Sequence, residues 1–583
     1  MSTATRFARR PPMRGSTGGL RERPAHRGAG RYLIVGVVII IVAYLAAVPV
    51  LYLIGGTFTD DAGAFSLGGF VRAFNPEAGA GAMMLNSLTF AVGSAAIALV
   101  IGTALAYVQV RTDTPGKPLL FAASMVPLII PGVLYAIAWI FLADAKVGLL
   151  NTFLFHPLGT PTHVYGLGGM IVIEGLHNAP LGFLFMVGAF QGMDPSLEES
   201  ASMSGARGPA VLRRVTLPLV RPGLVAAGLL LFVRALSDFE IPSILGLHDG
   251  VYVFTSRIYF ELRQYPIDYG SAGAYSLCLL LIAGAGVGIS TLLNRNARAY
   301  QTISGKAFRP RPVALGKARY WVAAGIVVYF VVAVVLPLLA LVYASLLNYF
   351  QPFSVGALSQ MSLDNYVKIF STSAMGNAFR NSFITAIVTA TVIILLCAVA
   401  AWFTVRTKVR GRRIIDVLTF LPLVIPGLVL GVALLFLYLR IPLPIYGTML
   451  ILIIAFCTLA LPFGMQYATS AMRQISNELE ESAEVSGAGW FTMFRRILLP
   501  LASGGLVAGW IYIAIVTFRE LSAAILVYSP GNEVASVLIW EQYENGSFMA
   551  LAAIGVVMVF VLAILVIVTQ RISSRFGLQR EIS

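Results

Sequence analysis

The chain is poor in charge and in cysteine. Asp, Glu, Lys and Arg together make up 11% of its 583 residues, whereas a soluble domain normally carries about 25%. A surface with so little charge cannot face water on all sides, which excludes a soluble enzyme and a disordered scaffold. The three cysteines, Cys278, Cys397 and Cys457, lie in apolar stretches with no partner spacing. They argue against a disulfide framework and against a metal-finger site.

Hydrophobic residues take the place of the missing charges and account for 58% of the chain. A helix that crosses a membrane needs about 20 mostly apolar residues. The sequence predicts an all-α polytopic membrane protein with about twelve such helices. The predicted spans are 32–55, 87–110, 119–143, 167–190, 220–247, 271–293, 320–346, 382–405, 414–439, 446–470, 502–528 and 548–570.

The net charge of +15 is concentrated between the predicted spans. Residues 1–31 hold eight arginines and one acid, and residues 294–319 hold seven basic residues and no acid. Cytoplasmic loops of membrane proteins carry this kind of excess. We therefore predict that both termini are cytoplasmic, and we attribute the charge to membrane topology and not to nucleic-acid binding.

The two halves of the sequence resemble each other. Pro127–Gly132 matches Pro422–Gly427 at an offset of 295, and residues 197–219 match 479–501 at an offset of 282 with 13 identities in 23 positions. An even number of spans in each copy gives both copies the same orientation, so the repeats are parallel and a pathway would lie between them.

These patterns predict five parts of the chain. They are a disordered basic cytoplasmic tail (1–31), a first six-helix repeat (32–293, core 85–293), a basic cytoplasmic linker (294–319), a second six-helix repeat (320–572, core 380–572) and a cytoplasmic C-terminal tail (573–583).

The stretch that repeats best is a cytoplasmic loop and not a membrane span. It contains Glu-Glu-Ser-Ala in both copies, then a glycine and, after an Arg-Arg pair, Leu-Pro. Gly205 and Gly487 can adopt φ > 0 and so end a short helix. One such loop could be an ordinary solvated surface. Two at equivalent places favour a shared partner surface.

This pattern resembles the "EAA" loop of ABC importer permeases of the binding-protein-dependent type, here with both permease halves fused in one chain. The departures are Ser200 and Ser482 for the usual second alanine, and Val215 for isoleucine. The resemblance implies a type I importer permease fold in which each loop docks on an ATPase. The residues that it assigns to ATPase coupling are Glu199, Ala201, Gly205, Leu217, Pro218, Glu481, Ala483, Gly487, Leu499 and Pro500.

The family also implies partners. They are a homodimeric ABC ATPase in the cytoplasm and a periplasmic or lipid-anchored substrate-binding protein, around a multi-pass protein of the bacterial inner membrane in contact with lipid. The chain contains no Gly-x-x-x-x-Gly-Lys-Ser/Thr loop. We therefore expect it to be a transport subunit and not an enzyme, with no cofactor or metal of its own, while ATP and magnesium bind the partner ATPase.

Charged residues interrupt the fifth predicted span of each half at matching positions. They are Asp238 and Glu240 in the first half, and Arg519 and Glu520 in the second. Ionisable groups within spans are costly and are functional candidates. Counting from the cytoplasmic end, they fall in the outer part of the membrane and suggest a substrate pathway or gate. The alternative is that they only fix the packing of the bundle.

The segments 236–246 and 518–531, which surround these charges, are similar to those of ferric-iron-type importer permeases. Acidic residues there suit a cation, which favours ferric iron. Thiamine and aminoethylphosphonate importers belong to the same branch and stay open as alternatives. A gradient-driven carrier with twelve helices is a further alternative, but it needs no duplicated docking loop.

Overall fold

The computed structural model describes residues 26–60, 63–159, 163–194, 196–206, 208–297, 312–407 and 410–575. Within these ranges the chain is built from helices, and extended pairing is limited to two isolated bridges. Most of the predicted basic tail, the centre of the predicted linker and the last eight residues lie outside the described residues. The first helix begins at His26, inside the predicted tail, because adding a residue to an existing helix costs less than starting a new one.

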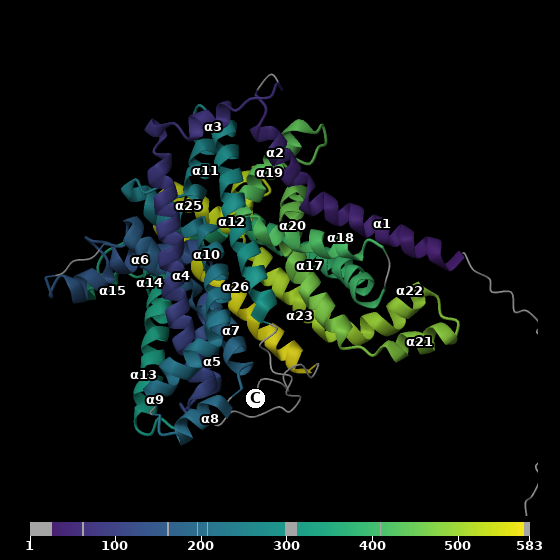
Figure 1. Ribbon diagram of the computed structural model, residues 1–583. Coiled ribbons are helices and arrows are strands. Elements are labelled where there is room, and N and C mark those ends of the chain that lie inside the picture. Colours follow the sequence, from purple (N-terminus) through teal and green to yellow (C-terminus); the bar gives the residue numbers. More distant parts are fainter. Residues whose placement is uncertain are drawn as a thin grey trace, which may run out of the picture.

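Among the described residues, the first half contains twelve α-helices. Figure 1 labels most of them. They are α1 (His26–Ala46), α2 (Val48–Thr57), α3 (Gly68–Ala73), α4 (Ala80–Arg111), α5 (Lys117–Met125), α6 (Gly132–Ala143), α7 (Gly166–Gln191), α8 (Ser196–Met203), α9 (Gly208–Val211), α10 (Leu217–Leu236), α11 (Phe254–Arg263) and α12 (Tyr269–Ala297).

The second half follows a similar order. Its helices are α13 (Ala318–Phe330), α14 (Leu336–Ser345), α15 (Val355–Ser359), α16 (Asp364–Ser371), α17 (Ser373–Arg406), α18 (Arg412–Phe420), α19 (Gly427–Arg440), α20 (Met449–Arg473), α21 (Asn477–Val485), α22 (Trp490–Met493), α23 (Leu499–Phe518), α24 (Ala524–Val527), α25 (Ala535–Glu544) and α26 (Phe548–Arg575). Short 3₁₀ and π-helical turns join several of these helices in both halves.

Ten described helical segments are long and apolar enough to cross a membrane, and two bent helix pairs raise the number to twelve if each pair is one span. The pairs replace the continuous helices predicted over 119–143 and 414–439. Their bends of 98° and 109° follow Pro131 and Pro426. A proline forces the residue before it out of the helical region, and Ile130 and Ile425 are indeed extended.

The fifth span of each half also ends earlier than predicted. The helices predicted over 220–247 and 502–528 stop at Leu236 and Phe518. Asp238, Arg519 and Glu520 therefore lie in breaks, and Glu240 begins the helical segment after the first break. The Asp238 carboxylate accepts a hydrogen bond from the Ile241 amide (3.0 Å), and Glu520 accepts one from Ala523 (3.3 Å). Acidic side chains compete in this way with the helical backbone bonds.

Equivalent helices form the centre of each half. Helices α4, α7, α10 and α12 pack together, as do α17, α20, α23 and α26. The contact between α4 and α7 is so close that a Cβ atom on Gly102 would lie 2.5 Å from the carbonyl carbon of Gly182. Small residues at such crossings let helix backbones approach in membranes.

The first helices of each half pack against the opposite half. Helices α1 and α2 contact α18, α19 and α20, while α13 and α14 contact α5 and α6. The hydroxyls of Tyr44 and Tyr438 are hydrogen-bonded, and Thr458 donates to the Leu45 carbonyl at 3.1 Å. The halves are therefore interlocked.

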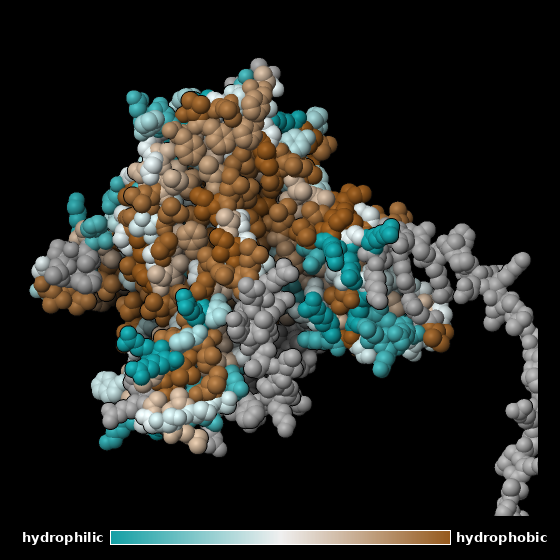
Figure 2. All heavy atoms as spheres, in the orientation of Figure 1, coloured by the Kyte–Doolittle hydropathy of each residue, from teal (hydrophilic) through white to brown (hydrophobic). Residues whose placement is uncertain are grey.

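The surface separates into apolar and polar zones. Figure 2 shows hydrophobic residues over the centre of the visible face and hydrophilic residues toward its upper and lower margins. A central apolar zone is what a membrane-spanning bundle presents to lipid.

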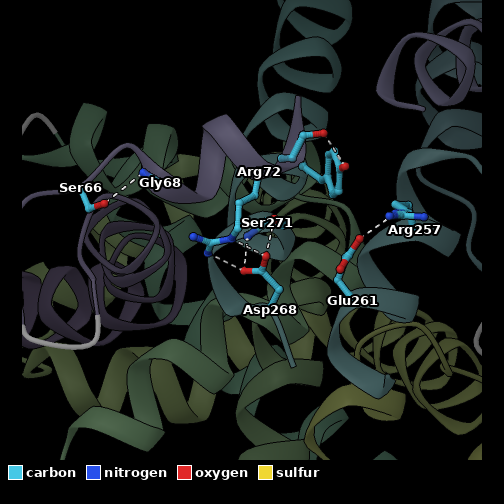
Figure 3. Close-up of polar contacts among 9 residues, drawn as sticks. Ser66, Gly68, Arg72, Arg257, Glu261, Asp268 and Ser271 are labelled. Atoms are coloured by element: carbon cyan, nitrogen blue, oxygen red, sulfur yellow. Dashed lines mark hydrogen bonds and ion pairs between the residues drawn. The ribbon is translucent and has the colours of Figure 1, made fainter. Parts of the chain in front are cut away.

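A polar anchor near the upper end of the molecule joins α3 to the start of α12. Arg72 donates two hydrogen bonds to the Asp268 carboxylate, both 2.8 Å long, and Ser271 donates to the same group (Figure 3). This bidentate pairing holds the pKa of Asp268 well below its usual range. On the neighbouring helix α11, Arg257 pairs with Glu261 at 2.7 Å.

Candidate functional site

Two equivalent loops carry the duplicated motif, and we name them the first loop (residues 197–218) and the second loop (residues 479–500). In Figure 1 the first loop, with α8 and α9, lies at the lower left, and the second, with α21 and α22, lies at the right. Each starts with a short helix, α8 or α21. The helix ends just before a glycine with positive φ, +86° at Gly205 and +80° at Gly487. The predicted turn is thus confirmed in both copies.

Apolar side chains protrude from both short helices. Met203 in the first loop and Val485 in the second occupy equivalent positions and are 89% and 90% exposed. Leu197 and Leu479, at the start of the loops, are also exposed. Apolar residues that repeat on the surface of two equivalent loops indicate a contact surface for a partner.

The residues predicted for coupling divide into two groups. Exposed members are available for contact with another chain, while the others face the rest of this chain. The exposed group is Glu199, Gly205, Pro218, Glu481, Gly487 and Pro500. The half-buried or buried group is Ala201, Leu217, Ala483 and Leu499.

A buried arginine holds each loop, a role that the sequence pattern did not predict. The Arg111 guanidinium donates to the carbonyls of Phe190 (2.9 Å) and Met193 (3.2 Å) and lies 3.4 Å from the Glu198 carboxylate. The only available signal was the match between Val110-Arg111-Thr112 and Val405-Arg406-Thr407.

The second half repeats this arrangement. Arg406 donates to the carbonyls of Met472 (2.6 Å) and Ile475, and its Nε lies 3.3 Å from the Glu480 carboxylate. The glutamate used is the first of the Glu-Glu pair in each loop. Its neighbour, Glu199 or Glu481, is left on the surface.

The predicted pathway residues lie between the two halves. Glu240 accepts a hydrogen bond from the Val133 amide (2.7 Å) at the start of α6, where the helix dipole favours a negative charge. Arg519, from the second half, donates to the Leu128 carbonyl of the first half. The bent pair of the first half therefore contacts charges from both halves.

Further polar groups surround these residues. Arg234 is within electrostatic range of Asp238, Glu240, Glu174 and Glu520. Glu174 on α7 accepts a hydrogen bond of 2.5 Å from Asn178.

Matched hydrogen bonds fix the segments that follow the breaks. Ser87 accepts from the Phe254 amide (2.9 Å) and Ser382 from the Ala535 amide (2.8 Å). Thr255 and Ser536 then donate to the carbonyls of Asp238 (2.6 Å) and Glu520 (2.7 Å). Hydroxyl side chains at equivalent positions thus hold the equivalent acidic residues, Asp238 and Glu520, in both halves.

Equivalent residues of the two halves meet on α11 and α25. Trp540 donates to the Tyr259 hydroxyl (3.0 Å), and Arg263 lies 3.8 Å from the Glu544 carboxylate. Tyr259 corresponds to Trp540, and Arg263 to Glu544, at an offset of 281. Because equivalent positions touch each other, this contact lies on the axis that relates the halves.

Comparisons with known proteins agree with this architecture. The family described as "Binding-protein-dependent transport system inner membrane component" matches residues 98–299 and 390–576. The chain is 27% identical over 456 residues to a ferric transport system permease protein of Actinobacillus pleuropneumoniae, covering 76% of this chain and 64% of that protein. This chain therefore spans slightly less than two thirds of that relative.

A second relative and a solved structure are also similar. The Fe(3+)-transport system permease protein FbpB 2 of Haemophilus influenzae is 24% identical over 465 residues, covering 78% of this chain and 82% of that protein. A chain of a bacterial ABC transporter that imports the polysaccharide alginate aligns with a TM-score of 0.35 at 16% identity, covering 45% of this chain and 99% of its own length.

The family matches one region in each half, and the two matched regions together cover most of the chain. Both contain the short loop helices, the bent pair and the charged breaks. The chain therefore belongs to the family of binding-protein-dependent transport system inner membrane components, and it contains the family domain twice.

Proposed function

We propose that this chain is the membrane-spanning subunit of an ATP-driven importer for ferric iron. The observation that carries the proposal is the pair of equivalent loops, each with an exposed glutamate and an exposed apolar side chain. A gradient-driven carrier needs no such pair, and the family assignment does not favour that alternative.

The two loops support docking of a homodimeric ATPase. They present the same residue types at the same positions, Glu199 with Met203 and Glu481 with Val485. Two copies of one ATPase subunit could therefore bind them in the same way. The excess of basic residues beside the spans supports placing the loops and both termini in the cytoplasm.

The proposed cargo follows from two observations. Two relatives that each align with more than three quarters of this chain are named ferric transport permeases. The breaks between the halves hold the carboxylates of Asp238, Glu240 and Glu520, with Glu174 close by. We assign Asp238, Glu240, Arg519 and Glu520 to the pathway or its gate. The acids attract a cation, and Arg519 fixes the bent pair.

A resident metal site forms no part of this proposal. Among the residues that the structure describes, no group of three or more His, Cys, Asp or Glu side chains is arranged to hold a metal ion. Iron would pass through as cargo, released by a binding protein on the outer side. We expect no stoichiometric metal on the purified chain.

Reconstitution tests the function directly. The chain is placed in proteoliposomes with a partner ATPase and a substrate-binding protein, and uptake of radioactive ferric iron is measured. We expect uptake that requires ATP and both partners. Uptake of thiamine or an aminoethylphosphonate instead of iron would show that the cargo is that compound and not ferric iron. Uptake driven by a proton gradient without the ATPase would overturn the proposal.

A further inference from the structure

The buried arginines at the ends of α4 and α17 connect each loop to the membrane helices. Arg111 is 2% exposed, and a buried guanidinium is tolerated only where its charge and its N–H groups find partners. Its partners are the Phe190 carbonyl at the end of α7, the Met193 carbonyl just beyond that helix, and the Glu198 carboxylate of α8. One side chain therefore joins three helices.

The other hydrogen bonds of Glu198 and Glu480, the glutamates paired with the buried arginines, differ between the halves. The second oxygen of Glu198 accepts a hydrogen bond of 2.5 Å from Thr216, in the turn that leads directly into α10. The second oxygen of Glu480 accepts one of 3.2 Å from Trp402 on α17. The position of Thr216 is taken in the second half by Leu498, which cannot make this bond.

The first loop is thus connected to the helix that carries the pathway charges. Helix α10 contains Arg234 and ends two residues before Asp238. The second loop is connected instead to α17, whose other end holds the segment after the second break through Ser382.

We propose that Arg111 with Glu198, and Arg406 with Glu480, are positioning pairs that transmit loop movement to the membrane helices, and that only the first pair acts on α10 through Thr216. This inference rests on the proposed docking of an ATPase. It assigns different tasks to the two glutamates of each loop. Glu199 and Glu481 contact the partner, while Glu198 and Glu480 carry the movement inward.

The first experiment needs no partner. Hydrogen exchange of the full chain in lipid nanodiscs is compared between Glu198→Gln and the exposed control Glu199→Gln. We expect several-fold faster exchange of the α8 amides in Glu198→Gln only, with α7 unchanged. Equal exchange in both variants would overturn the positioning role, whether or not an ATPase binds.

The second experiment uses the complex with the ATPase and binding protein. Glu198→Gln and Thr216→Val are expected to keep ATPase association while the ATP hydrolysed per iron imported rises several-fold. Glu199→Gln should instead weaken association, and Leu498→Val should change neither. If Thr216→Val left the ATP hydrolysed per iron imported unchanged, the proposed action of the first pair on α10 would be overturned. Failure of the wild-type chain to bind any ATPase would refute the proposed function, while the exchange experiment would still decide the positioning role.

Discussion

Single glycines set the shape of both loops. Gly205 and Gly487 have φ of +86° and +80°, and a Cβ added at either position would meet nothing within 4 Å. The cost of substitution is therefore conformational and not steric. A β-branched residue is strongly disfavoured at positive φ, by about 1–3 kcal/mol.

We predict that Gly205→Val and Gly487→Val each impair ATP-driven uptake about tenfold or more, because the turn that orients the loop helix is lost. Insertion into the membrane should be unaffected, since both glycines lie outside the candidate spans. Gly489→Val is the matched control, because Gly489 lies in the second loop with φ of −71° and has open space around it. Wild-type uptake in both loop variants would contradict the assignment.

The contribution of the ion pair between Arg72 and Asp268 to stability should depend on pH. The pKa of Asp268 is lowered in the folded chain because Arg72 donates to its carboxylate. The pair therefore stabilises fully above the unfolded pKa of about 3.9 and loses its effect as the pH falls further. Arg72 is largely exposed, so the contribution is under about 1 kcal/mol.

Asp268→Asn should accordingly lower the melting temperature slightly, and by the same amount at pH 7 and pH 5. Thermal unfolding in detergent measures this difference. A difference that disappeared on going from pH 7 to pH 5 would show that the pKa of Asp268 is raised and not lowered.

At the scale of helices, sequence patterns predict where the membrane spans lie but not where a helix bends or stops. Apolar length located the spans, and it placed the ends of α7 and α20 to within a few residues. It treated the proline pairs near Pro131 and Pro426 as parts of continuous helices, because apolar composition alone does not report a bend. It likewise extended α10 through Asp238, although the Asp238 side chain accepts a hydrogen bond from the Ile241 amide and so caps the segment that follows the break.

The candidate site was predictable where the repeat preserved it. Glu199, Gly205 and their second-half equivalents follow from the duplicated motif. The buried role of Glu198 could not be predicted, because its partner Arg111 is 87 residues away in the sequence and only the packing of α4 on α7 brings the two together.

A substitution of Glu240 can distinguish a role of the buried charges in the substrate pathway from a role in helix packing. Glu240→Gln keeps an oxygen that can accept from the Val133 amide but removes the negative charge. We predict that iron uptake falls about tenfold, or about 1.4 kcal/mol, because the negative charge that attracts the cation is lost. Thermal stability should change by under about 1 kcal/mol. Full uptake in this variant would favour the packing role.

At the scale of the whole molecule, the halves are interlocked by exchanged helices and meet on their common axis. Helices α1 and α2 pack on the second half, and α13 and α14 pack on the first. Movement of one half is therefore transmitted to elements of the other. The contact between Arg263 and Glu544 lies on the axis, so any separation of the halves at this end must break it.

We predict that cross-linking Arg263→Cys to Glu544→Cys abolishes iron uptake and that a reducing agent restores it, because the halves can then no longer separate there. ATP hydrolysis by the partner provides the second measurement. Uptake at the wild-type rate with the cross-link in place would show that α11 and α25 stay together throughout transport.

The central claim is that both loops face an ATPase on the same side of the membrane. Met203→Cys and Val485→Cys, each introduced separately, test it by labelling with a membrane-impermeant thiol reagent and by cross-linking to the ATPase. We predict that both cysteines are labelled only from the cytoplasmic side and that both cross-link to the ATPase. Labelling of either cysteine from the outside, or cross-linking through one loop alone, would contradict the account.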